Sequence, residues 1–231
     1  MERLDKILAN TGRWSRKEAR ELVRAGRVAV DGVTAQAADG KYDPAARFEV
    51  DGETVSGERL GYLMPAGLVS ATEDPRQPTV LELLPQHLRR VGLFPAGRLD
   101  KDTEGLLLLT NDGPLAHRLL APRHHVDKTY FVRVDGELDG ADAAAFAAGM
   151  MLEDGLVCLP AGLEVLEQPD TALVTLHEGK YHQIKRMLAA RGKPVVYLKR
   201  LTMGPLMLDP VLERGEWRPL SAEEVAALRQ A

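Results

Sequence analysis

The sequence predicts an α+β fold built from two units of unequal size. Three observations lead to this prediction. Residues 1–55 show two helical segments followed by short strands, and residues 55–61 become polar and glycine-containing and lose apolar periodicity. The remainder mixes short apolar runs with helical stretches at residues 114–120, 141–150 and 182–190, in an order too irregular for a doubly wound parallel sheet.

The first unit has the local signals of a helix, a second helix and a strand. Apolar residues recur at helical spacing over residues 4–8, and Ser15 with Glu18 forms an S-x-x-E capping box at the start of the second helix. Gly26 suits the end of that helix, and VAVDG at residues 28–32 predicts a strand that enters a turn.

Basic side chains are concentrated in two regions although the net charge is −4. Residues 1–30 contain eight Lys or Arg against four Asp or Glu, and residues 179–204 contain seven basic residues and no acidic one. Around the second predicted helix the basic residues recur every three or four positions: Arg13, Arg16, Lys17, Arg20 and Arg24. A solvated helix face would look similar, but two separated basic regions favour contact with nucleic-acid phosphates.

Composition limits the compartment and the kind of chemistry. A chain of 231 residues with 45% hydrophobic content can bury a core. Its single cysteine, Cys158, cannot form an internal disulfide, and the N-terminus has no apolar run of signal-peptide length, so we expect a cytoplasmic protein. We expect neither a metal nor a cofactor, because the sequence has no metal-ligand cluster of familiar spacing and no glycine-rich nucleotide-binding loop.

The stretch GRLDKDTEGLLLLTNDG, residues 97–113, joins a charged turn to four consecutive leucines. Side chains alternate in an extended segment, so Arg98 and Asp100 would face one way and the leucine between them the other. A solvated turn would explain the charges, but an Arg and an Asp at the mouth of a buried strand also suit a reactive cleft. We interpret Asp102 and Glu104 as solvated turn residues.

Two further segments place polar residues at the start of predicted core elements. HHVDKTYFVRV, residues 124–134, puts Lys128 and Tyr130 at the start of a strand with the same alternation. EGKYHQIKRMLAARGKPV, residues 178–195, leads into a basic amphipathic helix on which Lys185 lies off the apolar stripe. Taken singly, Tyr130 could be an ordinary strand aromatic and Lys185 an ordinary solvated lysine.

Together these three segments resemble the signature segments of the RsuA-type pseudouridine synthases, which isomerise uridine in ribosomal RNA. Near the N-terminus, RLDKILA and SRKEARELVRAGRVAVDG resemble the small RNA-binding module named after ribosomal protein S-four. The resemblance implies an RNA-binding domain over residues 1–58. A pseudouridine synthase catalytic domain would follow over residues 59–231, with a mixed, mainly antiparallel sheet flanked by helices.

The resemblance also implies a role for each residue singled out. Asp100 would be the catalytic aspartate, Tyr130 the aromatic that stacks on the target base, and Lys185 the basic partner of the aspartate. Arg98 would help to hold the flipped nucleotide. The full set expected to contact RNA is Arg13, Arg16, Lys17, Arg20, Arg24, Arg98, Lys128, Lys180 and Arg186. Isomerisation involves no net redox change and needs no external donor, so no cofactor is implied.

The target implied by the resemblance is a uridine of small-subunit 16S ribosomal RNA, because HHVDKTY and the Pro160-Ala161 step are most similar to the small-subunit enzymes. The expected partner is ribosomal RNA or the assembling small subunit, contacted by a monomer. The alternatives are a large-subunit 23S enzyme of the same family, a non-catalytic ribosome-assembly factor, and a glycosidase that would release free uracil. One departure is that residues 62–72 reach Pro65 without the Asn-Lys pair usual in the family, so this strand looks shortened.

Overall fold

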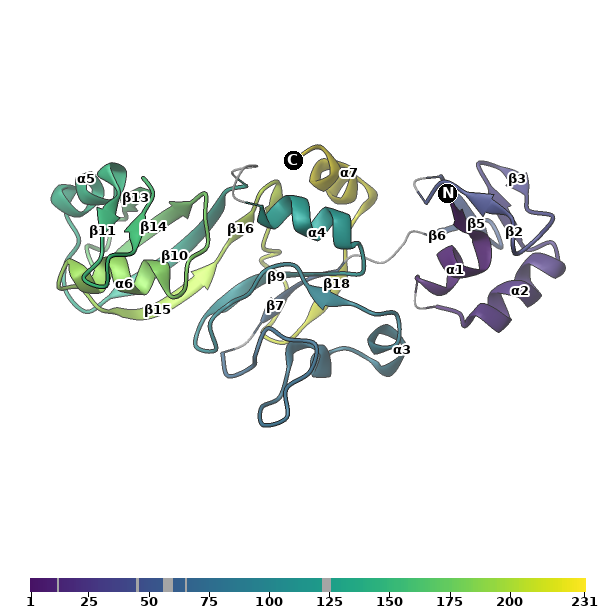
Figure 1. Ribbon diagram of the computed structural model, residues 1–231, viewed down its shortest axis with the longest axis horizontal. Coiled ribbons are helices and arrows are strands. Elements are labelled where there is room, and N and C mark those ends of the chain that lie inside the picture. Colours follow the sequence, from purple (N-terminus) through teal and green to yellow (C-terminus); the bar gives the residue numbers. More distant parts are fainter. Residues whose placement is uncertain (12, 45, 56–59, 65, 122–125) are drawn as a thin grey trace.

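The computed structural model describes residues 1–231 apart from residues 12, 45, 56–59, 65 and 122–125 (Figure 1). Several features of the sequence therefore lie outside the described residues: the boundary expected at residues 58 and 59, most of the polar segment around it, and Pro65. In Figure 1 the N-terminal elements gather at one end and the remaining elements form a larger body.

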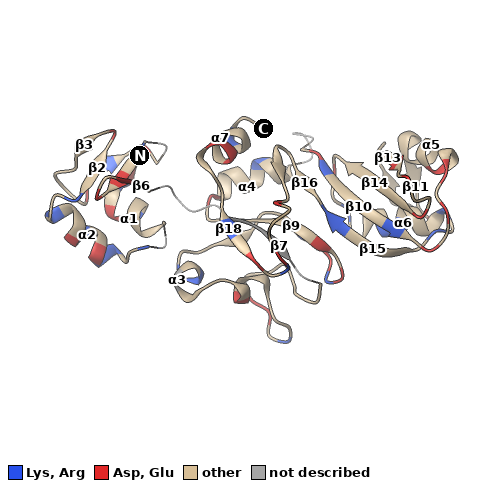
Figure 2. Cartoon of the chain, turned by 180° about the vertical axis from the view of Figure 1, so that it is seen from behind, with Lys and Arg blue, Asp and Glu red and all other residues tan. Residues whose placement is uncertain are grey.

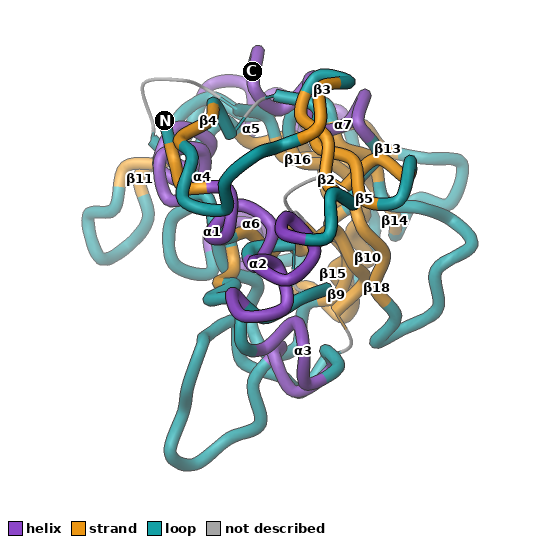
Figure 3. Tube along the Cα trace, turned by 90° about the vertical axis from the view of Figure 1, so that its right-hand side faces the viewer, coloured by secondary structure: helices purple, strands orange, loops and turns teal. Residues whose placement is uncertain are grey.

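The N-terminal unit packs two helices against a small sheet. Its elements are β1 (Glu2–Arg3), α1 (Leu4–Ala9), α2 (Arg16–Arg24), β2 (Val28–Val30), β3 (Val33–Thr34), β4 (Lys41–Tyr42), β5 (Phe48–Val50) and β6 (Glu53–Val55). The four-stranded sheet has the order β3-β2-β5-β6, and β1 pairs with β4. Figure 3 views the molecule from this end, with α1 and α2 next to each other and β2 and β5 beside them.

The local signals that predicted these two helices are confirmed. The backbone N–H of Glu18 donates to the Ser15 hydroxyl at 3.2 Å, and the Ser15 N–H donates to the Glu18 carboxylate at 2.7 Å. Gly26 follows α2 with φ +69°, a left-handed conformation that glycine adopts without strain. The apolar sides of α1, α2, β2 and β5 then bury one shared core.

The larger unit is organised around one sheet. Its elements are β7 (Leu60–Met64), the 3-10 helix η1 (Val80–Leu83), α3 (Gln86–Arg89), β8 (Phe94–Pro95), β9 (Glu104–Thr110), α4 (Gly113–Leu120), β10 (Lys128–Val134), α5 (Gly140–Ala148), β11 (Met150–Met151), β12 (Val157–Cys158), β13 (Gly162–Val165), β14 (Thr171–Leu176), α6 (Gln183–Ala190), β15 (Val195–Arg200), β16 (Thr202–Met203), β17 (Leu206–Met207), β18 (Trp217–Pro219) and α7 (Ala222–Gln230). The strand order is β13-β14-β10-β15-β9-β7-β18, with β8 also paired to β9. Only the β9–β15 pair is parallel among the described strands, which confirms the mixed, mainly antiparallel sheet.

Strand β9 explains the run of four leucines, because it is covered on both faces. Leu106 and Leu108 pack with α4 and α7, whereas Leu107 and Leu109 pack with η1 and α3. A strand buried on both sides needs apolar residues at every position, so its sequence shows no alternation. Gly105 allows β9 to approach β15 closely, since a Cβ there would lie 2.2 Å from a backbone oxygen of β15.

The interpretation of Glu104 as a solvated turn residue was wrong. Glu104 begins β9 and is only 5% exposed, because the parallel pairing with β15 starts at this residue. Its carboxylate accepts a hydrogen bond from the Tyr197 hydroxyl at 3.0 Å and pairs with Arg214 at 2.9 Å. These two partners provide compensation for the buried charge.

The helix expected over residues 141–150 ends earlier than predicted. It ends at Ala148, Gly149 takes φ +72°, and residues 150–151 form β11 against β12. A Cβ at Gly149 would lie 2.7 Å from the Cys158 carbonyl oxygen, so the turn into this hairpin needs glycine. The other two expected helices are observed as α4 and α6, each within one residue of its predicted start. Within the described chain, no helix has the length and apolar character needed to cross a membrane.

Candidate active site

The loop that carries Asp100 is fixed on both sides of that residue. The Leu99 N–H donates to the Ser70 hydroxyl at 3.0 Å, and this hydroxyl donates to the Leu99 carbonyl at 3.2 Å. Further along, the Thr103 N–H donates to the Asp100 carbonyl at 2.9 Å. Leu99 is buried in the core while Arg98 is exposed and Asp100 is half-buried, as the predicted alternation requires.

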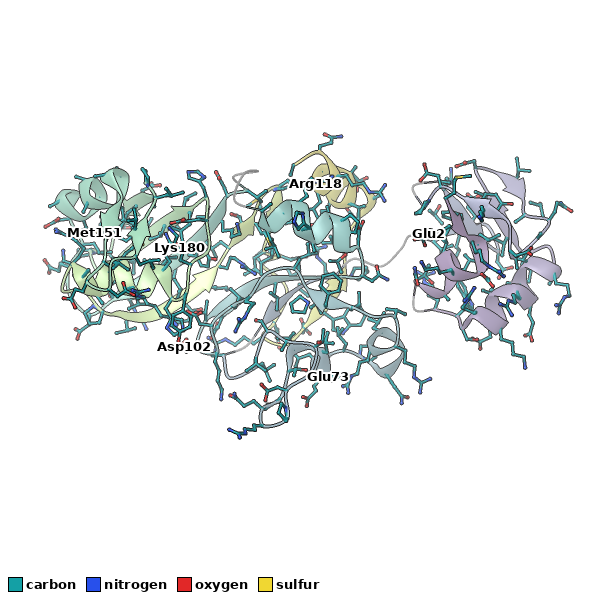
Figure 4. All side chains as sticks on the ribbon, viewed as in Figure 1. Glu2, Glu73, Asp102, Arg118, Met151 and Lys180 are labelled. Atoms are coloured by element: carbon teal, nitrogen blue, oxygen red, sulfur yellow. The ribbon has the colours of Figure 1, made fainter. Side chains whose placement is uncertain are left out.

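A cavity of about 1080 Å³ opens beside this loop and brings together polar residues from all three sequence segments. It is lined by the loop before β9, by the start of β10 and by the segment that leads into α6. The sequence-predicted residues that line it are Arg98, Asp100, Lys128, Tyr130, Lys180 and Lys185. Figure 4 labels Asp102 and Lys180 in this region, where the loop before β9 meets the segment before α6.

Lys185 joins two carboxylates at the mouth of this cavity. Its Nζ lies 2.9 Å from Asp100 Oδ2 and also forms an ion pair with Asp102. Burial disfavours the charged lysine, but the hydrogen bonds to Asp102 and Asp100 outweigh burial and raise the pKa of Lys185. The same hydrogen bond from Lys185 lowers the pKa of Asp102. Asp102 lies in a turn and its side chain is 75% exposed, which confirms its interpretation as a solvated turn residue, but it also shares the lysine of Asp100.

Sequence reasoning missed His182, which lies on the other side of Asp100. Its Nε2 is 3.6 Å from Asp100 Oδ1, and its ring stacks on Tyr181 with centroids 3.9 Å apart. The backbone of His182 has φ +50°, a conformation that residues other than glycine adopt rarely and that recurs at functional sites. The available signal was its place directly before the basic helix.

Arg200 was also missed as a member of the site. It lines the cavity from the end of β15 and is only 1% exposed. Tyr130 is its register partner on β10, so both side chains project from the same face of the sheet. The available signal was a charged residue two positions after Leu198, in the apolar register of a strand.

Not every predicted RNA-contacting residue belongs to the cavity. Arg186 is absent from its lining and pairs with Asp154 at 2.5 Å. Lys180 lines the cavity but is held by the carbonyl of Val157 and by Glu178, whose carboxylate is 2.8 Å away. Figure 2 colours the Lys and Arg positions of the chain blue, and those on α6 and β15 lie in one part of the molecule while those on α2 lie at its other end.

The basic side chains of α2 are partly engaged within their own unit. Arg16 Nη2 and Arg20 Nε lie 3.0 and 2.8 Å from the carboxylate of Asp5, whose side chain is fully buried. Burial opposes ionisation of Asp5, but hydrogen bonds from three arginines outweigh it and hold the pKa of Asp5 well below its usual range. The arginine heads, about half exposed, are therefore fixed in place. Arg13, Lys17 and Arg24 are exposed.

In the part of the chain that the structure describes, no group of three or more His, Cys, Asp or Glu is arranged to hold a metal ion. The charged and aromatic groups gathered in the cavity are instead the carboxylates of Asp100 and Glu178, several cations, and the rings of Tyr130 and Tyr181. This set suits binding of an anionic, aromatic ligand next to a carboxylate.

Comparison with known proteins agrees with this arrangement. The family model described as RNA pseudouridylate synthase matches residues 65–190. This chain belongs to that family. An S4 domain matches residues 2–39, so the synthase carries the RNA-binding module expected at its N-terminus.

Relatives of this synthase match it over nearly their whole length. An uncharacterized RNA pseudouridine synthase of Bacillus subtilis, YtzG, is 48% identical over 99% of this chain and 98% of its own. Ribosomal small subunit pseudouridine synthase A of Pseudomonas aeruginosa is 43% identical over 98% of this chain and 100% of its own. A crystal structure of a pseudouridylate synthase is 34% identical, with a TM-score of 0.70 over 99% of this chain and 100% of that chain. The resemblance to RsuA-type synthases is thereby confirmed.

Proposed function

We propose that this synthase isomerises one specific uridine of small-subunit 16S ribosomal RNA, with the base flipped into the cavity and Asp100 as the reacting carboxylate. The observation that carries the proposal is the 2.9 Å contact between Asp100 and Lys185 in a cavity that Tyr130 also lines. The ribosomal target is supported by relatives named ribosomal small subunit pseudouridine synthase A, at 43% identity in Pseudomonas aeruginosa and 42% in Escherichia coli.

The proposed reaction is an internal rearrangement of the nucleotide. The bond between C1′ and N1 breaks, the uracil turns, and C5 bonds to C1′. A proton then leaves C5 and N1 gains one, so no electrons are exchanged with a partner. Asp100 can attack C1′ or stabilise a cationic sugar, and Lys185 holds the carboxylate in position. Within this proposal Tyr130 supplies a stacking face for a base that must leave the RNA stack before it can react.

A glycosidase of the same site would need a second carboxylate to activate water. Three other carboxylates lie beside Asp100 or line the same cavity, and each is already engaged. Asp102 is bound by Lys185, Glu104 by its buried partners, and Glu178 by Lys180. This engagement favours rearrangement of the nucleotide over release of free uracil.

The S4 domain supplies a second RNA contact in this proposal. We place it within residues 1–58, ahead of a catalytic domain over residues 59–231. Lys17 and Arg24 would contact phosphates directly, while Asp5 holds Arg16 and Arg20 ready for the same role. The protein would act as a monomer on the assembling small subunit, in the cytoplasm.

The test is a pseudouridine map of 16S and 23S ribosomal RNA from cells with the protein, without it, and with Asp100→Asn in its place. We expect one 16S pseudouridine to vanish without the protein and to return with the wild type but not with Asp100→Asn. A missing site in 23S RNA would overturn the small-subunit target. Restoration by Asp100→Asn would overturn the assignment of the carboxylate, and free uracil from purified protein and RNA would favour the glycosidase.

A further inference from the structure

Two buried cations line the cavity without a carboxylate partner among the described residues. Arg200 is 1% exposed, and Lys128 is 8% exposed. Arg200 Nε donates to the Leu106 carbonyl at 2.7 Å, but its Nη2 is buried and has no hydrogen-bond partner in the described part of the chain. Lys128 Nζ donates to the Val126 carbonyl at 2.8 Å. Burial lowers the pKa of Lys128, and the neighbouring Arg200 lowers it further.

A structural role accounts for only part of this arrangement. The bond from Arg200 to the carbonyl of Leu106 helps to join β15 to β9, where the parallel pairing consists of two residue pairs. That bond leaves the other N–H groups of the guanidinium to be satisfied. Buried charges without an ionic partner are costly, and apolar residues of similar volume would close the same space at lower cost. The unused donor of Arg200 therefore points to a ligand.

The positions of the two cations indicate which part of a nucleotide they would meet. Arg200 pairs in register with Tyr130 on β10, and Lys128 lies two residues before Tyr130 on the same strand, so all three share one face of the sheet. Both cations are more buried than Asp100 or Lys185, whose side chains are 27% and 19% exposed. The RNA backbone stays at the mouth when a nucleotide flips, so donors deeper in the cavity meet the base.

The chemistry of uracil matches these donors. Its edge carries two carbonyl oxygens, O2 and O4, and both take up negative charge when the bond from N1 to C1′ breaks. Fixed donors in a site closed to water stabilise such developing charge strongly.

We propose that Arg200 and Lys128 donate hydrogen bonds to a carbonyl oxygen of the target uracil and stabilise the negative charge that the base acquires as it leaves C1′. This inference rests on the proposed active site. It adds a function for Arg200 and Lys128, which lie deeper in the cavity than Asp100 and Lys185. Asp100 and Lys185 would act at the sugar, whereas Arg200 and Lys128 would act at the base.

The test combines protein variants with substrates altered at one oxygen. Single-turnover rates are measured for wild type, Arg200→Gln, Lys128→Gln and the control Lys199→Gln, on RNA fragments whose target nucleotide is uridine, 2-thiouridine or 4-thiouridine. Lys199 is a suitable control because it follows Leu198 on the same strand with its side chain on the opposite face from Arg200. Sulfur accepts hydrogen bonds weakly, so each thio substitution weakens one specific contact.

We expect Arg200→Gln and Lys128→Gln to slow uridine conversion by roughly 10²-fold at unchanged RNA affinity, the loss typical of one missing donor to developing charge. Thio substitution at the contacted oxygen should slow the wild type and the control Lys199→Gln. It should slow Arg200→Gln and Lys128→Gln little further, because these two variants have already lost that contact. A merely structural role would lower all the rates of a variant by one common factor.

The inference would be overturned if, for both variants and at both oxygens, the rate loss from the protein substitution and the rate loss from the thio substitution simply multiplied. If Arg200→Gln does not fold, Lys128→Gln decides, since that change leaves the junction of β9 and β15 intact. Asp100→Asn on the uridine substrate separates the two proposals. Full activity of that variant would refute the active site itself, whereas an inactive Asp100→Asn together with independent thio effects would refute only the base contact.

Discussion

Asp100→Asn and Asp102→Asn each remove one negative charge from a carboxylate bound to Lys185, and the structure predicts very different losses. Asp102 is 75% exposed, so its ion pair is of the solvated kind and contributes about 0.2–1 kcal/mol. That range corresponds to a roughly 1.5- to 5-fold fall in rate if the whole contribution positions Lys185. Asp100 is 27% exposed and carries the proposed bond-forming oxygen. An amide cannot replace that oxygen, so we expect a loss of about 10⁴-fold or more.

The assay is single-turnover conversion of a 16S RNA fragment, with RNA affinity measured in parallel for both variants. Affinity should stay within a few-fold of wild type, because neither substitution touches the basic surface of the S4 domain. Losses within a factor of about ten of each other would refute the reasoning, since Asp100 would then be no more than another partner of Lys185.

Four further predictions concern other residues of the structure. Tyr130→Phe keeps the stacking face and removes the hydroxyl. If the ring only stacks on the base, the measured rate of conversion should stay close to wild type. If the hydroxyl moves the C5 proton, the rate should fall strongly while RNA still binds. Gly105→Ala places a Cβ 2.2 Å from a backbone oxygen of β15, at a residue with φ +107°. Urea unfolding should therefore show a free energy of unfolding lower by roughly 3 kcal/mol or more. A decrease of less than about 1 kcal/mol would contradict the close approach of β9 and β15. Lys17→Gln and Arg24→Gln should each reduce the slope of log affinity against log salt by roughly 0.7–0.9, with turnover on saturating RNA preserved; an unchanged slope would exclude phosphate contacts by these residues. Asp5→Asn should destabilise the S4 domain by roughly 1–3 kcal/mol at neutral pH, because the buried carboxylate loses its charge-assisted hydrogen bonds while the three arginines, about half exposed, are still solvated. The folded pKa of Asp5 is depressed, so the stability it contributes is present above its unfolded pKa of about 3.9 and is lost as pH falls below that value; in acid, wild-type and variant melting temperatures should converge.

Local chemistry was readable from the sequence because its causes lie within a few residues of one another. Ser15 and Glu18 are three positions apart, so their capping box could be recognised without knowledge of the rest of the fold. The leucine run of β9 likewise required a strand covered on both faces, and Arg98 and Asp100 followed from the extended chain in front of it. The two-unit α+β organisation came from the same kind of local pattern.

Only the tertiary structure decided which of these segments meet. Lys185 reaches Asp102 as well as Asp100, and Glu104 is buried against Tyr197, because β15 pairs with β9 across a long separation in sequence. No local pattern encodes that pairing, since the energy comes from strands that come together only when the whole sheet closes. The same closure buries Arg200 in the cavity. The local elements and the candidate residues could therefore be predicted from the sequence, whereas the partners and the exposure of those residues were determined by the long-range packing of the sheet.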